Sequence, residues 1–182
     1  AMGVSGPRVL ELALGEVVSD EELGGWRVHA EITGNIDRVA EDERDCFGLI
    51  RNYLSYMPSH DQELPPTAKV PEGSGNDMPG ILNLLPEKRN QGYDMHTILK
   101  CIMDKGSLFP IKPDFGESVI TALARVEGQV AGVVANQPFF NGGAMDTDGI
   151  DKVLSFLCLC DSFNIPLLFF HDIPGFMVGK EA

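Results

Sequence analysis

Helical patterns occupy most of the first third of the chain. The run Ser19-Asp20-Glu21-Glu22 places a serine three residues before a glutamate, the capping-box pattern of a helix N-terminus, and Gly24-Gly25 ends that short helix. From Asp42 to Met57 apolar residues recur at helical spacing, and Pro58 ends the pattern. The sequence therefore predicts two helices, the second a surface helix with one buried stripe. The stripe consists of Cys46, Phe47, Ile50, Leu54 and Met57.

Residues 58–92 show few periodic signals and are rich in proline and glycine. Irregular runs of this length are uncommon inside a compact domain and often join two lobes. Gly73-Ser74-Gly75 lies here, but no strand precedes it and no third glycine follows at the spacing of a dinucleotide-binding loop. We therefore interpret the segment as a linker or long crossover.

The second half changes from a helical period to the period of β-strands. The expected elements are, in order, a helix at 95–102, strands at 119–126 and 129–135, a helix at 147–163 and a strand at 167–170. Glu127-Gly128 has the chemistry of a hairpin turn between the first two strands. The last strand is wholly apolar, as expected in a sheet covered on both faces. This order predicts an α/β layer fold.

The loop Asp172-Ile173-Pro174-Gly175-Phe176 directly follows the last strand. Ligands of α/β sheets collect at the carboxyl ends of strands. Gly175 can adopt backbone angles closed to other residues, and Pro174 stiffens the entry to the loop. Such a loop can aim backbone N–H groups at an oxygen that becomes negative. The alternative is a plain turn, since Pro-Gly is a common turn signal.

A second candidate, Asn136-Gln137-Pro138 with Asn141-Gly142-Gly143, follows a strand and precedes a helix, where anions are favoured, but it can equally be a connector. No pair of histidines has metal-ligand spacing, and only His171 lies near the proposed site. Helix capping explains Asp146, Asp148 and Asp151 without a cation. We therefore predict no metal site.

Composition narrows the function classes further. The chain has 182 residues and a formal net charge of −13, which disfavours nucleic-acid binding. Its four cysteines match no zinc or disulfide pattern and suit reduced thiols in a cytosolic or matrix compartment. No apolar run approaches the ~20 residues that a membrane span requires. We expect a protein of the cytoplasm, or of the mitochondrial matrix if the source is eukaryotic.

An ordered series of segments resembles one enzyme family: the carboxyltransferase (beta) subunits of propionyl-CoA and methylmalonyl-CoA carboxylases and the related biotin-dependent decarboxylases. No single segment is specific, but together they run nearly end to end in the family's order. They are Gly15-Glu16-Val17-Val18-Ser19 with Glu22-Leu23-Gly24-Gly25 and His29, Leu54-Ser55-Tyr56-Met57-Pro58, Gly106-Ser107-Leu108-Phe109, Ala124-Arg125-Val126-Glu127-Gly128, Val134-Ala135-Asn136-Gln137-Pro138, Cys160-Asp161-Ser162-Phe163-Asn164-Ile165-Pro166 and Asp172-Ile173-Pro174-Gly175-Phe176.

The resemblance implies an incomplete crotonase-like α/β fold at the junction of two related halves. Residues 1–60 would end the N-terminal carboxyltransferase half, residues 61–92 would be the Pro/Gly-rich crossover, and residues 93–182 would begin the C-terminal half. The glycine-rich segments of both halves, including the acyl-CoA oxyanion hole, would lie outside this chain. The chain alone is therefore expected to be inactive. Its last strand needs sheet neighbours and a helical cover that the missing sequence would provide, so we expect exposed apolar surface on the second half and self-association.

The family's reaction, as the resemblance implies it, moves a carboxyl group between carboxybiotin and a short-chain acyl-CoA. Two oxyanion holes of backbone N–H groups hold the enolates, which suits a sequence without an evident base. The backbone N–H groups of Gly175 and Phe176 would belong to the biotin-side hole, and Pro174 would line the biotin site. Biotin on a carrier protein and a coenzyme A thioester are the expected cofactor and substrate.

The resemblance also implies partners: a biotin carboxyl carrier protein, a biotin carboxylase subunit and further copies of the same subunit. Three alternatives stay open. The chain can be a non-catalytic assembly or interaction module of the same fold, or part of a biotin-dependent decarboxylase. It can also be a crotonase-fold hydratase or thioesterase, for which Asp172 and Glu181 are the nearby acids.

Overall fold

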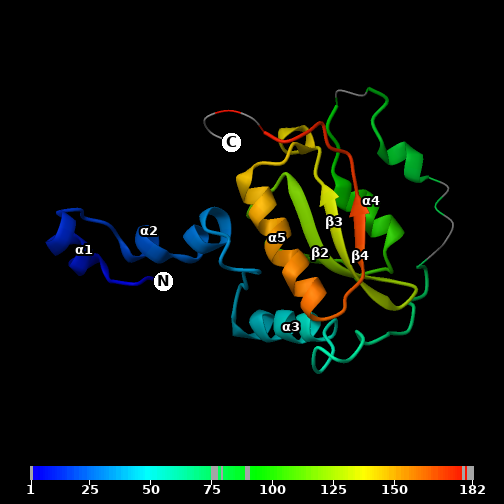
Figure 1. The fold of residues 1–182 in the computed structure, drawn as a ribbon, viewed down its shortest axis with the longest axis horizontal. Helices are drawn as coiled ribbons and strands as arrows, with labels where there is room; N and C mark the ends of the chain where they lie inside the picture. The colour runs from blue at the N-terminus through cyan, green and yellow to red at the C-terminus, as the bar shows by residue number, and fades with distance from the viewer. Residues whose placement is uncertain (1, 75–77, 79, 89–90, 178, 180–182) are drawn as a thin grey trace.

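The fold is described from a computed structural model, which places residues 2–74, 78, 80–88, 91–177 and 179. A four-stranded mixed sheet forms the centre of the second half (Figure 1). Its strands, in spatial order, are β1 (Phe109–Ile111), β2 (Val119–Val126), β3 (Gln129–Asn136) and β4 (Leu167–Phe170). β1, β2 and β3 pair antiparallel, whereas β3 and β4 pair parallel. Only β1 was not expected from the sequence, because three residues are too few to show a period.

The hairpin between β2 and β3 confirms the turn predicted at Glu127-Gly128. Val126 pairs with Gln129, and both turn residues have positive φ, 51° for Glu127 and 78° for Gly128. The carboxylate of Asp104 accepts hydrogen bonds from both turn amides, at 3.1 Å from Glu127 and 2.7 Å from Gly128. The turn is therefore stabilised by turn residues that accept positive φ and by the buried carboxylate of Asp104.

One helix covers each face of the sheet, which confirms the expected α/β layers. α5 (Thr147–Ser162) lies in front of the strands in Figure 1, and α4 (Met95–Ile102) lies behind them. Alternate strand residues face the two helices: Leu123 clusters with Phe156 of α5, and Ala122 clusters with Leu99 of α4. A Cβ on Gly132 would lie 2.6 Å from the Sγ of Cys160, so α5 approaches β3 closely.

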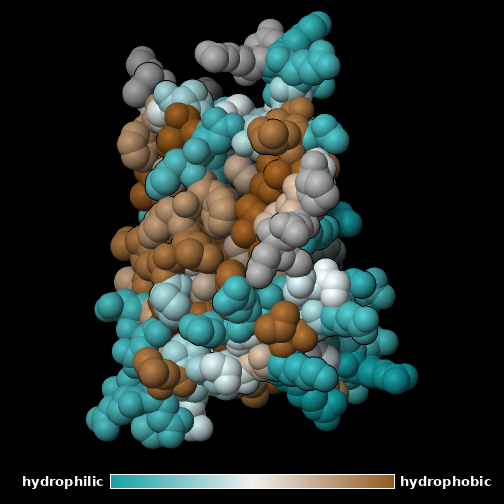
Figure 2. Space-filling view, turned by 90° about the vertical axis from the view of Figure 1, so that its right-hand side faces the viewer, coloured by the Kyte–Doolittle hydropathy of each residue, from teal (hydrophilic) through white to brown (hydrophobic). Residues whose placement is uncertain are grey.

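The expected cover on both faces holds for the sheet but only in part for β4, whose Leu167 packs on the α5 side and whose Leu168 and Phe170 pack on the α4 side. Among the described residues β4 is an edge strand that pairs only with β3, and its four residues are half-buried or exposed. The side chain of Phe169 is 47% exposed. Figure 2 shows apolar side chains gathered on the side of the molecule where β4 lies. The apolar pattern of β4 therefore matches a strand that is only half covered in this chain.

The N-terminal arm, residues 2–34, extends away from the sheet (Figure 1). It contains α1 (Pro7–Leu14), which was not predicted, then α2 (Asp20–Gly24) and the π-helical turn Val28–Ile32. α1 begins at a proline and buries none of its residues. α2 confirms the capping box predicted at Ser19 and Glu22, with both reciprocal hydrogen bonds formed.

α3 (Glu43–Leu54) confirms a helix where one was predicted, but of the predicted buried stripe only Met57, just after the helix, packs against the core. Phe47, Ile50 and Leu54 are 57%, 48% and 58% exposed. The face that contacts the core carries Leu49 and Tyr53 instead, because α3 lies beside β1 and turns its more apolar face outward. No helix in the described part of the chain is long and apolar enough to cross a membrane.

Candidate functional site

Both loops that were singled out from the sequence leave the same edge of the sheet. β3 and β4 run parallel with Ala135 opposite Phe170, so their carboxyl ends lie side by side. The first loop, residues 136–146, joins β3 to α5, and the second, residues 171–177, follows β4. The structure therefore brings together the two candidates that the sequence left separate.

The side chain of Asn136 ties these loops to each other. Asn136 is 5% exposed; its Nδ2 donates to the carbonyl of Gly143 at 3.0 Å, and its Oδ1 accepts from the amide of Asp172 at 3.4 Å. A Cβ on Gly143 would lie 2.8 Å from the carbonyl oxygen of Asp172, and Gly143 has a φ of 80°. Gly143 is thus required for the close approach of the loops.

Gly175 and Phe176 lie at the far end of the second loop. Met145 forms an isolated bridge with Phe176: its amide donates to the Gly175 carbonyl at 3.2 Å, and its carbonyl accepts from Met177 at 2.7 Å. The amides of Gly175 and Phe176 donate to no described residue. Gly175 has a φ of 146°, which favours glycine, and the side chain of Phe176 is 65% exposed. Two backbone donors are therefore available next to each other.

A buried glutamine links the first loop to the end of the crossover. Gln137 is 2% exposed; its Oε1 accepts from the amide of Met95 at 3.0 Å, and its Nε2 donates to the Oδ1 of Asp94 at 2.6 Å. Asp94 is also the N-cap of α4 and contacts the Nδ1 of His96 at 2.9 Å. Burial raises the pKa of Asp94, but hydrogen bonds from Gln137 and His96 outweigh it and hold the pKa below its usual value.

Tyr93 joins the crossover to the second loop. Its Oη donates to the Oδ2 of Asp172 at 2.8 Å, so this acid is already engaged and not an open catalytic carboxyl. Sequence reasoning named Asp172 and Gln137 but missed Tyr93 and Asp94. A signal existed for Asp94, which stands at the N-cap position of the predicted helix, but none indicated the partner of Tyr93. Glu181, the other acid considered, lies outside the described residues.

A cavity of about 510 Å³ opens between the crossover and the two loops. One wall comes from described residues between Leu85 and Tyr93, and the other comes from residues of both loops. Lys88 supplies a cation to this space, and Pro174 lies on its wall. The cavity is lined by Leu85, Pro86, Lys88, Gln91, Gly92, Tyr93, Pro138, Gly142, Asp172, Ile173 and Pro174. A ligand of moderate size thus has room beside the loop that carries Gly175.

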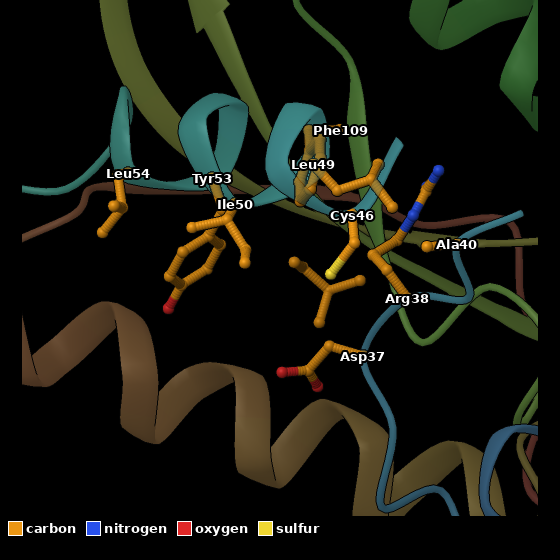
Figure 3. Close-up of a pocket in the computed structure, with 10 residues that line it drawn as sticks. Asp37, Arg38, Ala40, Cys46, Leu49, Ile50, Tyr53, Leu54 and Phe109 are labelled. Atoms are coloured by element: carbon orange, nitrogen blue, oxygen red, sulfur yellow. The ribbon is translucent and has the colours of Figure 1, made fainter. Parts of the chain in front are cut away.

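A second cavity, of about 290 Å³, lies elsewhere, between α3 and the segment 37–40 (Figure 3). Figure 3 shows Leu49, Ile50 and Tyr53 of α3 on one side and Asp37 and Arg38 on the other. Burial, with the negative charge of Asp37, raises the pKa of Tyr53 and keeps its phenol protonated. The lining is mostly apolar and contains no activated nucleophile, so catalysis is not assigned to this cavity.

Other titratable groups near the sheet are structural. The Nζ of Lys152 lies 2.7 Å from the carbonyl oxygens of both Phe115 and Val119, and burial lowers its pKa to about 8. Burial raises the pKa of Cys160 to about 12, which makes it a poor nucleophile. The His171 ring stacks on Phe169 of β4, 5.7 Å between centroids. Within the described residues no three His, Cys, Asp or Glu side chains lie close enough to hold a metal ion.

Similarity to known proteins covers the whole chain. The family model of the carboxyl transferase domain matches residues 1–182. The chain is 42% identical over 182 residues to the uncharacterized carboxylase YngE of Bacillus subtilis, covering 100% of this chain and 35% of that protein. It is 40% identical over 183 residues to the biotin-dependent long chain acyl-coenzyme A carboxylase beta4 subunit of Mycobacterium tuberculosis, covering 99% of this chain and 35% of that protein.

A solved structure is also similar to nearly the whole chain. The transcarboxylase 12S structure with hydrolyzed methylmalonyl-coenzyme A, described as a hexamer assembly, superposes with a TM-score of 0.93 at 35% identity, over 98% of this chain and 35% of that chain. The chain thus spans about a third of the length of the relatives it matches. Because the family model covers every residue and the sheet superposes closely, the chain belongs to the carboxyl transferase domain family and has its crotonase-like fold.

Proposed function

We propose that this chain is part of an acyl-CoA carboxyltransferase that moves a carboxyl group between biotin and a coenzyme A thioester. The observation that carries the proposal is the match of the whole chain to the carboxyl transferase domain. The relatives named for an activity include a long chain acyl-coenzyme A carboxylase subunit and the methylmalonyl-CoA decarboxylase subunit alpha of Veillonella parvula. The class of substrate that they share is an acyl-CoA, so we assign that class and no acyl length.

The residues of the second loop fit one part of this reaction. When bound, biotin supplies a ureido group that carries and releases the carboxyl group, and negative charge then develops on the ureido oxygen. The amides of Gly175 and Phe176, which donate to no described residue, can donate to such an oxygen. The cavity of about 510 Å³ reaches Pro174, the residue just before them, and offers space for a ring system. Backbone donors need no proton transfer of their own, which agrees with a site whose Asp172 is engaged by Tyr93.

The proposal extends to partners. A carboxyltransferase of this kind receives biotin from a carrier protein that a biotin carboxylase loads, and transcarboxylase 12S assembles as a hexamer. The half-exposed β4 supports burial against further protein in the complete subunit. We therefore propose a homo-oligomer that works with a biotin carboxyl carrier protein and a biotin carboxylase subunit.

The test uses the full-length protein that contains this sequence. Purified protein is mixed with free biotin and methylmalonyl-CoA or malonyl-CoA, and formation of the decarboxylated acyl-CoA is followed by chromatography. We expect biotin-dependent turnover, absent from the 182-residue chain assayed alone. Lack of any biotin-dependent turnover with short-chain and long-chain carboxyacyl-CoA would contradict the proposed function and favour a non-catalytic assembly module.

A further inference from the structure

The end of the crossover lies directly against the candidate site. Tyr93 and Asp172 stand 79 positions apart in the sequence, yet their side chains share a hydrogen bond of 2.8 Å. Just before Tyr93, the backbone of Gly92 touches the first loop, since a Cβ there would lie 2.7 Å from the carbonyl oxygen of Pro138. The crossover therefore contacts both site loops within two consecutive residues.

The backbone that carries Tyr93 is held from its other side. The residues that follow, Asp94 and Met95, are both bonded to the side chain of Gln137, at 2.6 and 3.0 Å. Gln137 is 2% exposed and continues directly from β3, so it is itself fixed by the sheet. The phenol of Tyr93 thus projects from a well-anchored segment, which lowers the entropy lost when it holds a partner.

The second loop, by contrast, has few attachments of its own. At its start the amide of Asp172 reaches Asn136 only at 3.4 Å, and at its end the bonds to Met145 hold Gly175 and Met177. Between these points the described residues show no further backbone hydrogen bond. The Tyr93–Asp172 bond is therefore the stronger of two attachments at the entry to the loop that presents the free amides of Gly175 and Phe176.

The chemistry of the bond suits an attachment that does not change with pH in the neutral range. Burial, together with the hydrogen bond to Asp172, raises the pKa of Tyr93 to about 12. The phenol therefore keeps its proton, and remains a donor, throughout the neutral and mildly alkaline range. A carboxylate accepts such a hydrogen bond more strongly than a neutral oxygen does.

We propose that Tyr93 is a positioning residue: through the carboxylate of Asp172 it fixes the entry of the 172–177 loop and so sets the direction of the Gly175 and Phe176 amides. On this proposal, the junction at which the crossover ends, Gly92 and Tyr93, is part of the site and not a passive linker. The catalytic consequence rests on the proposed function, whereas the effect on the order of the loop does not.

The experiment compares Tyr93→Phe with Tyr56→Phe in the full-length protein. Tyr56 is a matched control, because its Oη also donates one hydrogen bond, at 2.7 Å to the carbonyl of Ser107, but in the core and away from both loops. Hydrogen–deuterium exchange of the peptide that spans residues 172–177 reports the order of the loop through its two hydrogen-bonded amides, those of Asp172 and Met177. Steady-state kinetics report kcat and the KM for acyl-CoA separately.

We expect Tyr93→Phe to speed exchange in the 172–177 peptide about three- to tenfold and to lower kcat by a similar factor, with the KM for acyl-CoA unchanged, as for loss of one hydrogen bond. Tyr56→Phe should lower the melting temperature without a selective change in that peptide or in kcat. Unchanged exchange in Tyr93→Phe overturns the proposal. Faster exchange with normal kcat overturns the positioning role. If the wild-type protein shows no carboxyl transfer, the proposed function fails. The exchange comparison alone then decides whether Tyr93 holds the entry of the 172–177 loop.

Discussion

The N-terminal arm and the sheet of the second half are built from similar local signals but differ in what surrounds them. In the arm, α1 ends at Gly15 and α2 begins with a complete capping box, yet Val9, Leu12 and Val17 are 56%, 89% and 81% exposed. In the sheet region, α4 and α5 have single-residue caps of the same kind and enclose fully buried side chains such as Leu123. Local chemistry therefore forms helices in both regions, but only one region has a core.

The difference shows which interactions stabilise each region of this chain. A capping interaction contributes about 1 kcal/mol, whereas complete burial of a leucine contributes about 2–3 kcal/mol, so burial outweighs capping at each position. In the described arm, α1 buries none of its residues, and α2 and the π-helical turn bury only Gly24 and Ala30. We therefore expect the sheet region to unfold cooperatively and the arm to respond to mutation independently.

The largest contrast should come from one leucine in each region. Leu123→Ala removes a side chain that is 0% exposed between β-strands and α5, and should lower the free energy of unfolding by about 3–5 kcal/mol. Leu12→Ala removes one that is 89% exposed, and should change the same free energy by less than about 0.5 kcal/mol. Urea denaturation of the 182-residue chain measures both. Equal losses in the two variants would show that the arm is part of the same cooperative unit.

A second contrast uses glycines with positive φ. Gly175 has a φ of 146° in the site loop, and Gly15 has a φ of 74° at the end of α1; an added Cβ would meet nothing within 4 Å at either position. Valine is therefore opposed by backbone angles and not by a clash in both cases. If the Gly175 amide holds a developing negative charge, Gly175→Val in the full-length protein should lower turnover by about 10²–10³, the scale of one lost oxyanion donor.

Two controls separate this effect from general damage. Gly15→Val should leave turnover unchanged, because the arm contributes no residue to the loops. Phe176→Leu keeps the backbone donor and removes only a side chain that is 65% exposed, so most activity should remain. Steady-state kinetics with melting curves measure all three variants. Normal turnover in Gly175→Val together with an inactive Phe176→Leu would assign the role to the side chain instead of the backbone.

A third contrast depends on pH. Burial lowers the pKa of Lys152 to about 8, while in the unfolded chain it stays near 10.5. Between these values the unfolded state binds more protons, so this lysine makes the free energy of unfolding rise with pH. The free energy of unfolding of the wild type minus that of Lys152→Met should therefore rise by about 1 kcal/mol between pH 8 and pH 9. Exposed Lys100 gives the matched variant Lys100→Met, for which no such rise is expected.

Unfolding curves at both pH values measure this rise. Cys160, whose pKa burial raises to about 12, makes the free energy of unfolding fall with pH above about 9, but it does so equally in wild type and variant. Only the difference between the proteins is therefore informative. A difference that stays constant from pH 7 to pH 9.5 would mean that the carbonyl oxygens of Phe115 and Val119 hold the proton on Lys152 as firmly as water does.

The sequence predicted elements well where a period or a cap is local. The 95–102 helix, the hairpin at Glu127-Gly128 and the helix from Thr147 all carry their own signals, and all are present. The face of α3 that packs was predicted wrongly, because Leu49 and Tyr53 contact the core through a placement that only β1 and α5 determine. α1 and β1 were missed, since eight and three residues leave little room for a pattern.

For the site, sequence reasoning found the loops but not what joins them. Asn136, Gln137 and Gly175 were named because each follows a strand or stands in a turn. The contact between Tyr93 and Asp172 spans 79 positions and leaves no local trace, so no single-sequence pattern indicates it. Gly143 was named as part of the second candidate, and the structure explains it by its close approach to the carbonyl of Asp172.

The smallest contrast compares two helix caps. The Ser19 side chain accepts from the amide of Glu22 in the arm, and the Asp146 side chain accepts from the amide of Gly149 at the start of α5, at 3.2 and 2.8 Å. Either alanine variant removes one cap, worth about 1 kcal/mol locally. Asp146→Ala should lower the melting temperature of the chain by about 2–4 °C, because α5 unfolds with the sheet. Ser19→Ala should shift it by less than about 1 °C, because α2 can fray alone.

Differential scanning calorimetry gives the melting temperature, and hydrogen exchange of residues 19–25 reports the local loss. If Ser19→Ala lowers the melting temperature as much as Asp146→Ala does, the arm is coupled to the core despite its exposure, and the division into two regions is wrong.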